Sequence, residues 1–331
     1  MNSHTKIAVI GGGSWATAIV KMLSENHDNI SWWMRNQDTI DHIQRYGNNP
    51  NYISAAELFP KKLSLSSNIN QIVESADCII LAVPSAFIRT TLKQLEKPIS
   101  NKFVVSAIKG IVAEKNRIIG EYLHNKYEIP FENIGVLTGP CHAEEVALER
   151  LSYLTVACED MEKAQWFADQ ISCRYIKTNV SEDIFGTEIS AVLKNVIAIA
   201  SGVCHSLGYG DNFQSVLASN AIREIKRFVD GVHPIKRDIK ESAYLGDLLV
   251  TMYCQFSRNR TFGNMIGKGY SVKSAQLEMN MVAEGYYAVK CIKELNEEYQ
   301  IDMPITDAVY NILYQRISPV MEMRILADKL N

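Results

Sequence analysis

One glycine-rich turn near the amino end constrains the fold of this chain more than any other feature. A short apolar run, residues 6–10 (KIAVI), ends directly at Gly11, and a segment with helical spacing follows at residues 15–23. A second apolar run then occupies residues 30–34. A strand, a glycine turn, a helix and a second strand in this order form a βαβ unit, and its two strands lie parallel.

The same alternation continues well beyond the first unit. Apolar runs lie at residues 78–83, 103–107, 134–137 and 154–157. Amphipathic segments, such as residues 85–95 and 116–127, lie between them. This alternation predicts a parallel sheet with helices on both faces.

After about Asp183 the strand-like runs stop, and only helical patterns remain. They include residues 214–228, 281–299 and 306–315. A chain of 331 residues is also too long for one ordinary core. We therefore expect an α/β domain at residues 1–185 and an all-α domain at residues 186–331.

Composition narrows the class of ligand. The formal net charge is -3 and no basic block dominates a segment, which argues against nucleic acid or an anionic membrane as the main partner. Residues 1–5 lack the pattern of a signal peptide, and the apolar stretch at 192–203 is too short to span a bilayer. We expect a soluble cytoplasmic protein without membrane insertion.

The cysteines and histidines give no sign of a cross-linked or metal-bound fold. The chain has seven cysteines, an odd number without a C-x-x-C pair, and its seven histidines show no metal-ligand spacing. We expect neither a disulfide framework nor a metal site.

The glycine turn itself has the form Gly11-x-Gly13-x-x-Ala16 between a strand and a helix. In this setting Gly11 permits the tight turn, Gly13 lets the backbone approach a pyrophosphate, and Ala16 allows close helix packing. The helix N-terminus would face the negative charge. Dinucleotide binding is favoured, and the alternative is a purely structural turn.

The end of the second strand bears on which dinucleotide is bound. The acidic residue usual at this place is missing, because Met34 is followed by Arg35 and Asn36. An arginine here suits a 2′-phosphate, so NADPH is allowed beside NADH. The alternative is that Arg35 is an ordinary solvated charge.

Lys194 is the candidate proton carrier. On a helical wheel it lies on a stripe of mostly small or polar residues, opposite an apolar face. The stripe consists of Thr187, Ser190, Lys194, Ala198, Ser201 and His205. This leaves room for a ligand beside the lysine, although a lysine that snorkels from a buried helix to water fits the segment equally well.

Other candidates follow strand-like runs or lie in turns between helices. Lys109 comes after residues 103–107, and Gly139-Pro140-Cys141-His142 follows 134–137. Ligands of open α/β sheets bind outside such strand ends. His142 by itself is more typical of a packing or capping residue. For Asp247 and for Ser257–Arg260, solvation is the default interpretation.

These segments together resemble a known family, the bacterial-type NAD(P)-dependent sn-glycerol-3-phosphate dehydrogenases, over nearly the whole chain. Eight matching segments occur in order with similar spacing: IGGGSWATA at 10–18, AIKG at 107–110, GPCHAEE at 139–145, LKNVIAIASG at 193–202, LGDLLVT at 245–251, SRNRTFG at 257–263, VAEGYYAVK at 282–290 and MPIT at 303–306.

The resemblance implies a Rossmann-type N-terminal domain and a helical C-terminal domain like that of 6-phosphogluconate dehydrogenase, with the active site between them. It further implies that Lys194 is the proton carrier and that Lys109 and Asp247 are partners of the substrate oxygens. Arg258 and Asn259 are implied to hold the substrate phosphate. Further implied substrate contacts are Gly139, Cys141 and Ser257. The implied cofactor contacts are Gly11, Gly13, Ser14, Trp15, Arg35, Lys109, Ala143, Arg258, Val282 and Glu284.

The chain departs from the family pattern at three places. Ala16 replaces a third glycine, Cys141-His142 replaces a hydroxyl residue followed by phenylalanine, and Asn220-Ala221 replaces an arginine-glycine pair. The last two leave details of the substrate loops open. A homodimer is the common expectation for the family.

The expected activity is interconversion of dihydroxyacetone phosphate and sn-glycerol 3-phosphate with NAD(P)H, which supplies glycerol phosphate for phospholipid synthesis. A lysine with an ordinary pKa of about 10.4 is protonated at neutral pH, so Lys194 would serve as general acid in reduction, and oxidation would have an alkaline optimum. Two alternatives remain, namely a β-hydroxyacid or 6-phosphogluconate-like dehydrogenase and a non-catalytic NAD(P)-binding sensor. The Ser257-Arg258-Asn259 match favours the glycerol phosphate family, and retention of both lysines with Asp247 argues against the sensor.

Overall fold

The computed structural model describes residues 5–112, 116–279 and 283–331. The chain divides into two compact units. The first consists of Met1–Ile108 and Ile119–Ile184, and the second of Lys109–Ile118 and Phe185–Asn331. The segment Lys109–Ile118 groups with the second unit, although it lies within the range 1–185 expected for the first domain.

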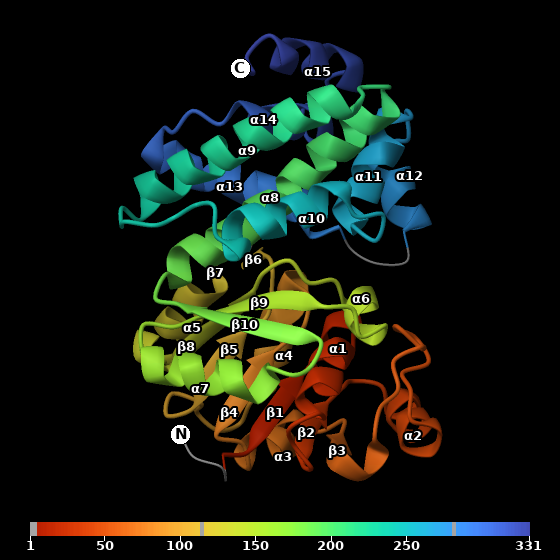
Figure 1. The fold of residues 1–331 in the computed structure, drawn as a ribbon, viewed down its shortest axis with the longest axis vertical. Helices are drawn as coiled ribbons and strands as arrows, with labels where there is room; N and C mark the ends of the chain where they lie inside the picture. Colours follow the sequence, from red (N-terminus) through yellow and green to blue (C-terminus); the bar gives the residue numbers. More distant parts are fainter. Residues whose placement is uncertain (1–4, 113–115, 280–282) are drawn as a thin grey trace. The chain divides into compact units, whose positions relative to one another are not determined.

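The first unit is built on an eight-stranded sheet in the order β10-β9-β8-β5-β4-β1-β2-β3 (Figure 1). The strands are β1 Ile7–Ile10, β2 Ile30–Trp33, β3 Leu63–Ser66, β4 Cys78–Leu81, β5 Phe103–Ser106, β8 Ile134–Thr138, β9 Ser152–Ala157 and β10 Ile176–Ser181. The strand order reverses direction between β1 and β4, the place where doubly wound sheets bind dinucleotides.

The expected α/β fold is confirmed, and the sheet is parallel except at one place. Among the described strands, neighbours in this sheet are parallel except β8 and β9, which are antiparallel. The reason lies in the connection at residues 139–151, whose only helix is α6, Ala143–Ala147, of five residues. At 1.5 Å per residue such a helix is too short to return the chain along a five-residue strand.

Helices cover both faces of the sheet, as the completely buried strands β1, β4, β5 and β8 require. Helices α1, α2, α6 and α7 share one hydrophobic core with the strands, in which Trp32 and Phe167 are the largest fully buried side chains. The helices of this unit are α1 Ser14–Leu23, α2 Gln37–Tyr46, α3 Ile69–Glu74, α4 Ile88–Leu92, α5 Ile119–Tyr127, α6 and α7 Met161–Ile171.

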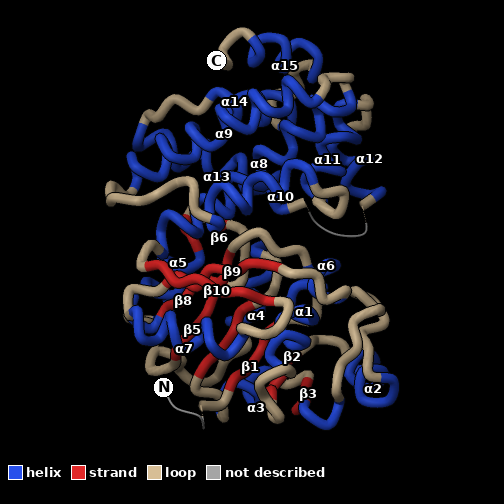
Figure 2. Tube along the Cα trace, viewed as in Figure 1, coloured by secondary structure: helices blue, strands red, loops and turns tan. Residues whose placement is uncertain are grey.

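Among its described residues, the second unit is helical apart from one small hairpin, β6 Ile111–Val112 with β7 Arg117–Ile118 (Figure 2). Its helices are α8 Ile184–Ser206, α9 Asp211–Val232, α10 Asp247–Tyr253, α11 Arg258–Gly267, α12 Val272–Glu278, α13 Glu284–Tyr299, α14 Pro304–Leu313 and α15 Pro319–Ala327. One turn of π-helix, Ser242–Gly246, precedes α10 directly.

Helix α8 forms the centre of this unit. It is long and apolar enough to cross a membrane, but 94% of its most apolar window is buried inside the protein, as in the core helix of a globular fold. Glycines bring its backbone against α11: a Cβ on Gly202 would meet the Arg260 carbonyl oxygen at 2.0 Å, and one on Gly263 would meet the Ile199 oxygen at 2.1 Å. This contact fixes the start of α11 relative to α8.

Candidate active site

Two lysines and one aspartate form a buried charged cluster in the second unit. Lys194 on α8 is 4% exposed and Asp247, the first residue of α10, is 1% exposed. The Nζ of Lys194 donates to Oδ1 of Asp247. The Nζ of Lys109 lies 3.4 Å from Oδ1 and 3.3 Å from Oδ2 of the same carboxylate. One carboxylate therefore holds two ammonium groups.

Each member of this cluster lies in a different segment of the chain. Asp247 begins α10 at the end of the π-helical turn, a type of irregularity that is frequent at functional sites. Lys109 opens the segment that leads into the β6–β7 hairpin, and its carbonyl oxygen accepts a hydrogen bond of 2.9 Å from Nδ2 of Asn195. The hairpin is anchored in turn, because Ile111 and Ile118 belong to the core of the second unit.

The burial of this cluster changes the acidity of its groups. Burial lowers the pKa of Lys194 from 10.5 to about 7, while the Asp247 carboxylate opposes the change and the Lys109 ammonium adds to it. Burial alone would raise the pKa of Asp247, but the two ammonium groups outweigh it and the net shift is downward. The alternative of a lysine that snorkels to water is wrong, and the expectation of an ordinary pKa for Lys194 is corrected.

The start of α11 contains the three residues expected to contact the substrate. The Oγ of Ser257 accepts a hydrogen bond of 3.3 Å from the backbone N–H of Arg260, so Ser257 is the N-cap of this helix. Asn259 is buried, and its Oδ1 accepts from the N–H of Gly285 in the first turn of α13 at 2.9 Å. Arg258, between them, is exposed.

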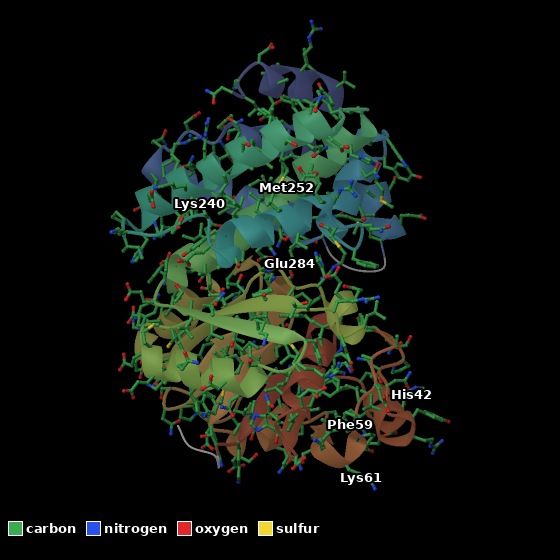
Figure 3. All side chains as sticks on the ribbon, in the orientation of Figure 1. His42, Phe59, Lys61, Lys240, Met252 and Glu284 are labelled. Carbon is green, nitrogen blue, oxygen red and sulfur yellow. The ribbon has the colours of Figure 1, made fainter. Side chains whose placement is uncertain are left out.

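Two expected cofactor contacts lie at or before the start of α13. Glu284 is the first residue of this helix, is partly exposed and is labelled in Figure 3. Val282 lies outside the described residues. The adjoining Gly285 packs closely on α8, since a Cβ there would meet the Asn195 carbonyl oxygen at 2.5 Å.

In the first unit, the glycine turn has the geometry that a dinucleotide needs. Gly11 has φ +138°, and a Cβ on it would meet the Ala82 carbonyl oxygen at 2.4 Å, so only glycine fits there. A Cβ on Gly13 would meet nothing within 4 Å, which leaves the backbone open to a ligand. Gly13 is the N-cap of α1, and Ser14 is the first helical residue. The N–H groups of this helix end fit a pyrophosphate.

Two residues that the sequence interpretation missed hold this turn in place. Nε1 of Trp32 donates to the Gly11 carbonyl oxygen at 2.6 Å. Asn49, completely buried, donates from Nδ2 to Oγ1 of Thr17 at 2.9 Å and to the Gly12 carbonyl oxygen at 3.2 Å. Trp32 lies in a predicted strand, whereas Asn49 lies in a loop, where a single asparagine carries no recognisable signal.

The other expected contacts in the first unit lie near strand ends. Arg35 is exposed just after β2, and Trp15 is partly buried and packs on the core. Gly139 follows β8 with φ +118°, where a Cβ would meet the Tyr153 carbonyl oxygen at 2.8 Å. Cys141 and Ala143 are both 7% exposed, and Ala143 is the first residue of α6.

The expected site residues thus fall into two groups, one in each unit. The structure brings Lys109, Lys194 and Asp247 into direct contact within the second unit. Asn195 is a further member that received no role from the sequence, although it is buried beside Lys194 and holds the Lys109 backbone. Within the described residues, no group of three His, Cys, Asp or Glu side chains could hold a metal ion.

Comparison with known proteins gives consistent matches. Residues 6–164 match the family described as NAD-dependent glycerol-3-phosphate dehydrogenase N-terminus, and residues 183–324 match the corresponding C-terminus. The glycerol-3-phosphate dehydrogenase [NAD(P)+] of Staphylococcus carnosus strain TM300 is 33% identical over 316 residues, covering 95% of each chain. That of Bacillus pumilus strain SAFR-032 is 35% identical over 314 residues, covering 94% of this chain and 90% of the relative.

Solved structures extend the comparison to three dimensions. The crystal structure of glycerol-3-phosphate dehydrogenase from Coxiella burnetii has a TM-score of 0.89 to this chain at 26% sequence identity and covers 98% of both chains.

Proposed function

Because the chain belongs to the NAD-dependent glycerol-3-phosphate dehydrogenase family, we propose that its buried Lys194 carries the proton of the family's reaction. The enzyme is an NAD(P)-dependent oxidoreductase that interconverts dihydroxyacetone phosphate and sn-glycerol 3-phosphate. The observation that supports the role of Lys194 most directly is its burial against Asp247, with Lys109 on the same carboxylate.

In reduction, the oxygen of the ketone becomes an alcohol oxygen and takes up one proton. Lys194 Nζ donates that proton, and in oxidation the neutral amine accepts it back. With its pKa lowered to about 7, Lys194 is well populated in both protonation states near neutral pH, as an acid–base group that works in both directions requires. The lowered pKa moves the optimum for oxidation to a lower pH than an unshifted lysine would give.

Asp247 and Lys109 support this transfer. The Asp247 carboxylate fixes the direction of the Lys194 ammonium and keeps part of it charged despite its burial. Lys109, whose side chain is 19% exposed, adds a second positive group at the same carboxylate. We assign it to the substrate oxygens, where a fixed cation stabilises the negative charge that develops during hydride transfer.

Residues of the glycine turn fit the cofactor. Gly11 and Gly13 with the N-terminus of α1 would hold the pyrophosphate, and Arg35 would contact the adenosine ribose or its 2′-phosphate. When bound, NAD(P)H supplies the hydride. We further assign Ser14, Trp15, Ala143, Val282 and Glu284, with Lys109 and Arg258, to cofactor contacts.

We assign the substrate phosphate to Arg258. Arg258 is an exposed residue in the first turn of α11, and that turn is fixed by the Ser257 cap and by the bond from Gly285 N–H to Asn259. A guanidinium can meet phosphate oxygens through two parallel hydrogen bonds. Gly139, Cys141, Ser257 and Asn259 complete the proposed substrate contacts. The proposed setting is a cytoplasmic homodimer that supplies glycerol phosphate to phospholipid synthesis.

The test is oxidation of NADH and of NADPH by the purified protein with a panel of carbonyl substrates. We expect rapid turnover with dihydroxyacetone phosphate and little with unphosphorylated dihydroxyacetone, β-keto acids or sugar acids. Preference for a keto acid would favour a β-hydroxyacid dehydrogenase, and cofactor binding without turnover on any substrate would favour a sensor.

A further inference from the structure

A second contact between α8 and α10 lies two helical turns beyond the lysine–aspartate contact. Ser201 follows Lys194 by seven residues, so both side chains lie on the same face of α8. The Oγ of Ser201 donates to the Met252 carbonyl oxygen of α10 at 3.1 Å. Ser201 is 1% exposed and Met252 is fully buried among the helices of this unit, where Figure 3 labels it.

Helix α10 is short, and α8 holds it near both ends. It has seven residues, with Asp247 at its first position and Met252 next to last. Met252 lies in the last turn of the helix, where carbonyl groups lack the usual intrahelical partner, so the Ser201 hydroxyl satisfies the Met252 carbonyl. The two contacts together define the position of α10 along α8.

Gln214 of α9 fixes the Ser201 side chain in turn. Its Oε1 lies 2.9 Å from Ser201 Oγ, and its Nε2 donates to the Ser201 carbonyl oxygen at 3.1 Å. Since a hydroxyl has one hydrogen, Ser201 shares it between Gln214 and Met252. Within the described part of the chain, both side-chain hydrogen bonds of Gln214 go to Ser201, so Gln214 bonds to α10 only through the serine.

We propose that Ser201 is a positioning residue for the reaction: its bond to the Met252 carbonyl sets α10 so that the Asp247 carboxylate meets Lys194. This inference rests on the proposed roles of Lys194 and Asp247. Ser201 itself is not proposed to touch substrate or cofactor.

The consequence of losing the bond can be read from the charges around Lys194. The charged groups that face it are the Asp247 carboxylate, which favours the ammonium form, and the Lys109 ammonium, which disfavours it. If α10 is free to move, the attraction weakens and the repulsion remains, so the pKa of Lys194 falls. Reduction needs the protonated lysine, so the pH at which its rate begins to fall also moves down.

The experiment compares Ser201→Ala with Gln214→Met in the full-length protein. For each, kcat/KM for dihydroxyacetone phosphate reduction is measured from pH 5 to 10, together with the thermal midpoint. The alkaline limb is the range in which kcat/KM falls as the pH rises. We expect Ser201→Ala to move this limb to lower pH by at least ~0.5 unit, which lowers kcat/KM at a given pH on the limb by ~3-fold. Gln214→Met also removes buried hydrogen bonds but leaves the serine hydroxyl entirely to Met252. It should lower the thermal midpoint without moving the limb.

If Ser201→Ala folds and its alkaline limb does not move, the proposal is wrong. Equal shifts of the limb in Ser201→Ala and Gln214→Met would also overturn it, because a general loosening of the helix packing would then explain both shifts. If Ser201→Ala does not fold, Ser201→Cys takes its place, since a thiol is a weak donor and should shift the limb in the same direction. Lys194→Met and Asp247→Asn are measured alongside. If Lys194→Met and Asp247→Asn retain normal activity and pH dependence, the proposed function has failed. If both lose activity as expected but Ser201→Ala leaves the alkaline limb in place, only the positioning role of Ser201 has failed.

Discussion

Replacing Asp247 with asparagine keeps the shape of the side chain and removes its charge, which leaves Lys194 beside Lys109 without a counter-ion. For charges at about 4 Å in an effective dielectric of ~20, the lost attraction is ~4 kcal/mol. At 1.36 kcal/mol per unit this lowers the pKa of Lys194 by ~3 units from its value of about 7. At pH 7 the protonated fraction then falls from about one half to ~10⁻³, a loss of ~500-fold in ketone reduction.

The assay is kcat/KM for reduction as a function of pH. Because the loss reflects protonation, it should shrink to ~10-fold at pH 5, where about a tenth of the variant's lysine is charged. Asp230→Asn is a matched control, since Asp230 also pairs with two cations, Lys226 and Arg237, within the second unit. Its profile should equal that of the wild type. A loss of equal size at every pH, or an alkaline limb that stays in place, would refute the electrostatic role of Asp247.

Three further substitutions test the cofactor site, the phosphate site and the contact between α8 and α11. Arg35→Asp should raise the Kd for NADPH by at least ~10-fold more than that for NADH, because it places a negative charge beside the 2′-phosphate, and equal effects in a fluorescence titration would exclude discrimination by Arg35. Arg258→Ala should raise KM and lower kcat for dihydroxyacetone phosphate while activity on unphosphorylated dihydroxyacetone changes little; equal loss on both substrates would direct the search for the phosphate site to Lys109. Gly202→Ala should lower the free energy of unfolding in urea by ~1–3 kcal/mol, since its Cβ would meet the Arg260 oxygen at 2.0 Å. The control Gly210→Ala, with open space around its Cβ, should cost less than ~1 kcal/mol, and equal costs would contradict the close helix contact.

The sequence was informative wherever local pattern and fold agree. Apolar runs ending in glycine located β1 and the dinucleotide turn, and the loss of such runs after about Asp183 predicted the helical second unit. The edge strands β3 and β10 were missed because their residues are mostly partly exposed and polar, so no apolar run marks them. The direction of β9 could not be predicted from the sequence either, because it depends on the length of one short helix.

The candidate site was also difficult to predict from the sequence, because its residues lie far apart along the chain. Asp247 lies 138 residues from Lys109 and 53 from Lys194 in the sequence, and only the family resemblance linked the three before the structure placed them in contact. The pKa of Lys194 could not be predicted either, since it depends on burial by helices far along the chain. The stripe of small residues on α8 was visible in the sequence, whereas the hydrogen bonds of Ser201 on that stripe to Met252 and Gln214 were not.

Lys194 is the group proposed to transfer the proton of the reaction. Lys194→Met keeps most of the apolar stem in its buried position and removes the transferable proton. Single-turnover reduction of dihydroxyacetone phosphate by pre-bound NADH measures the step directly. We expect a loss of at least ~10²-fold in the rate of NADH oxidation, with the Kd for NADH within about twofold of the wild type. A folded Lys194→Met protein that oxidises NADH at a near-normal rate would contradict this role.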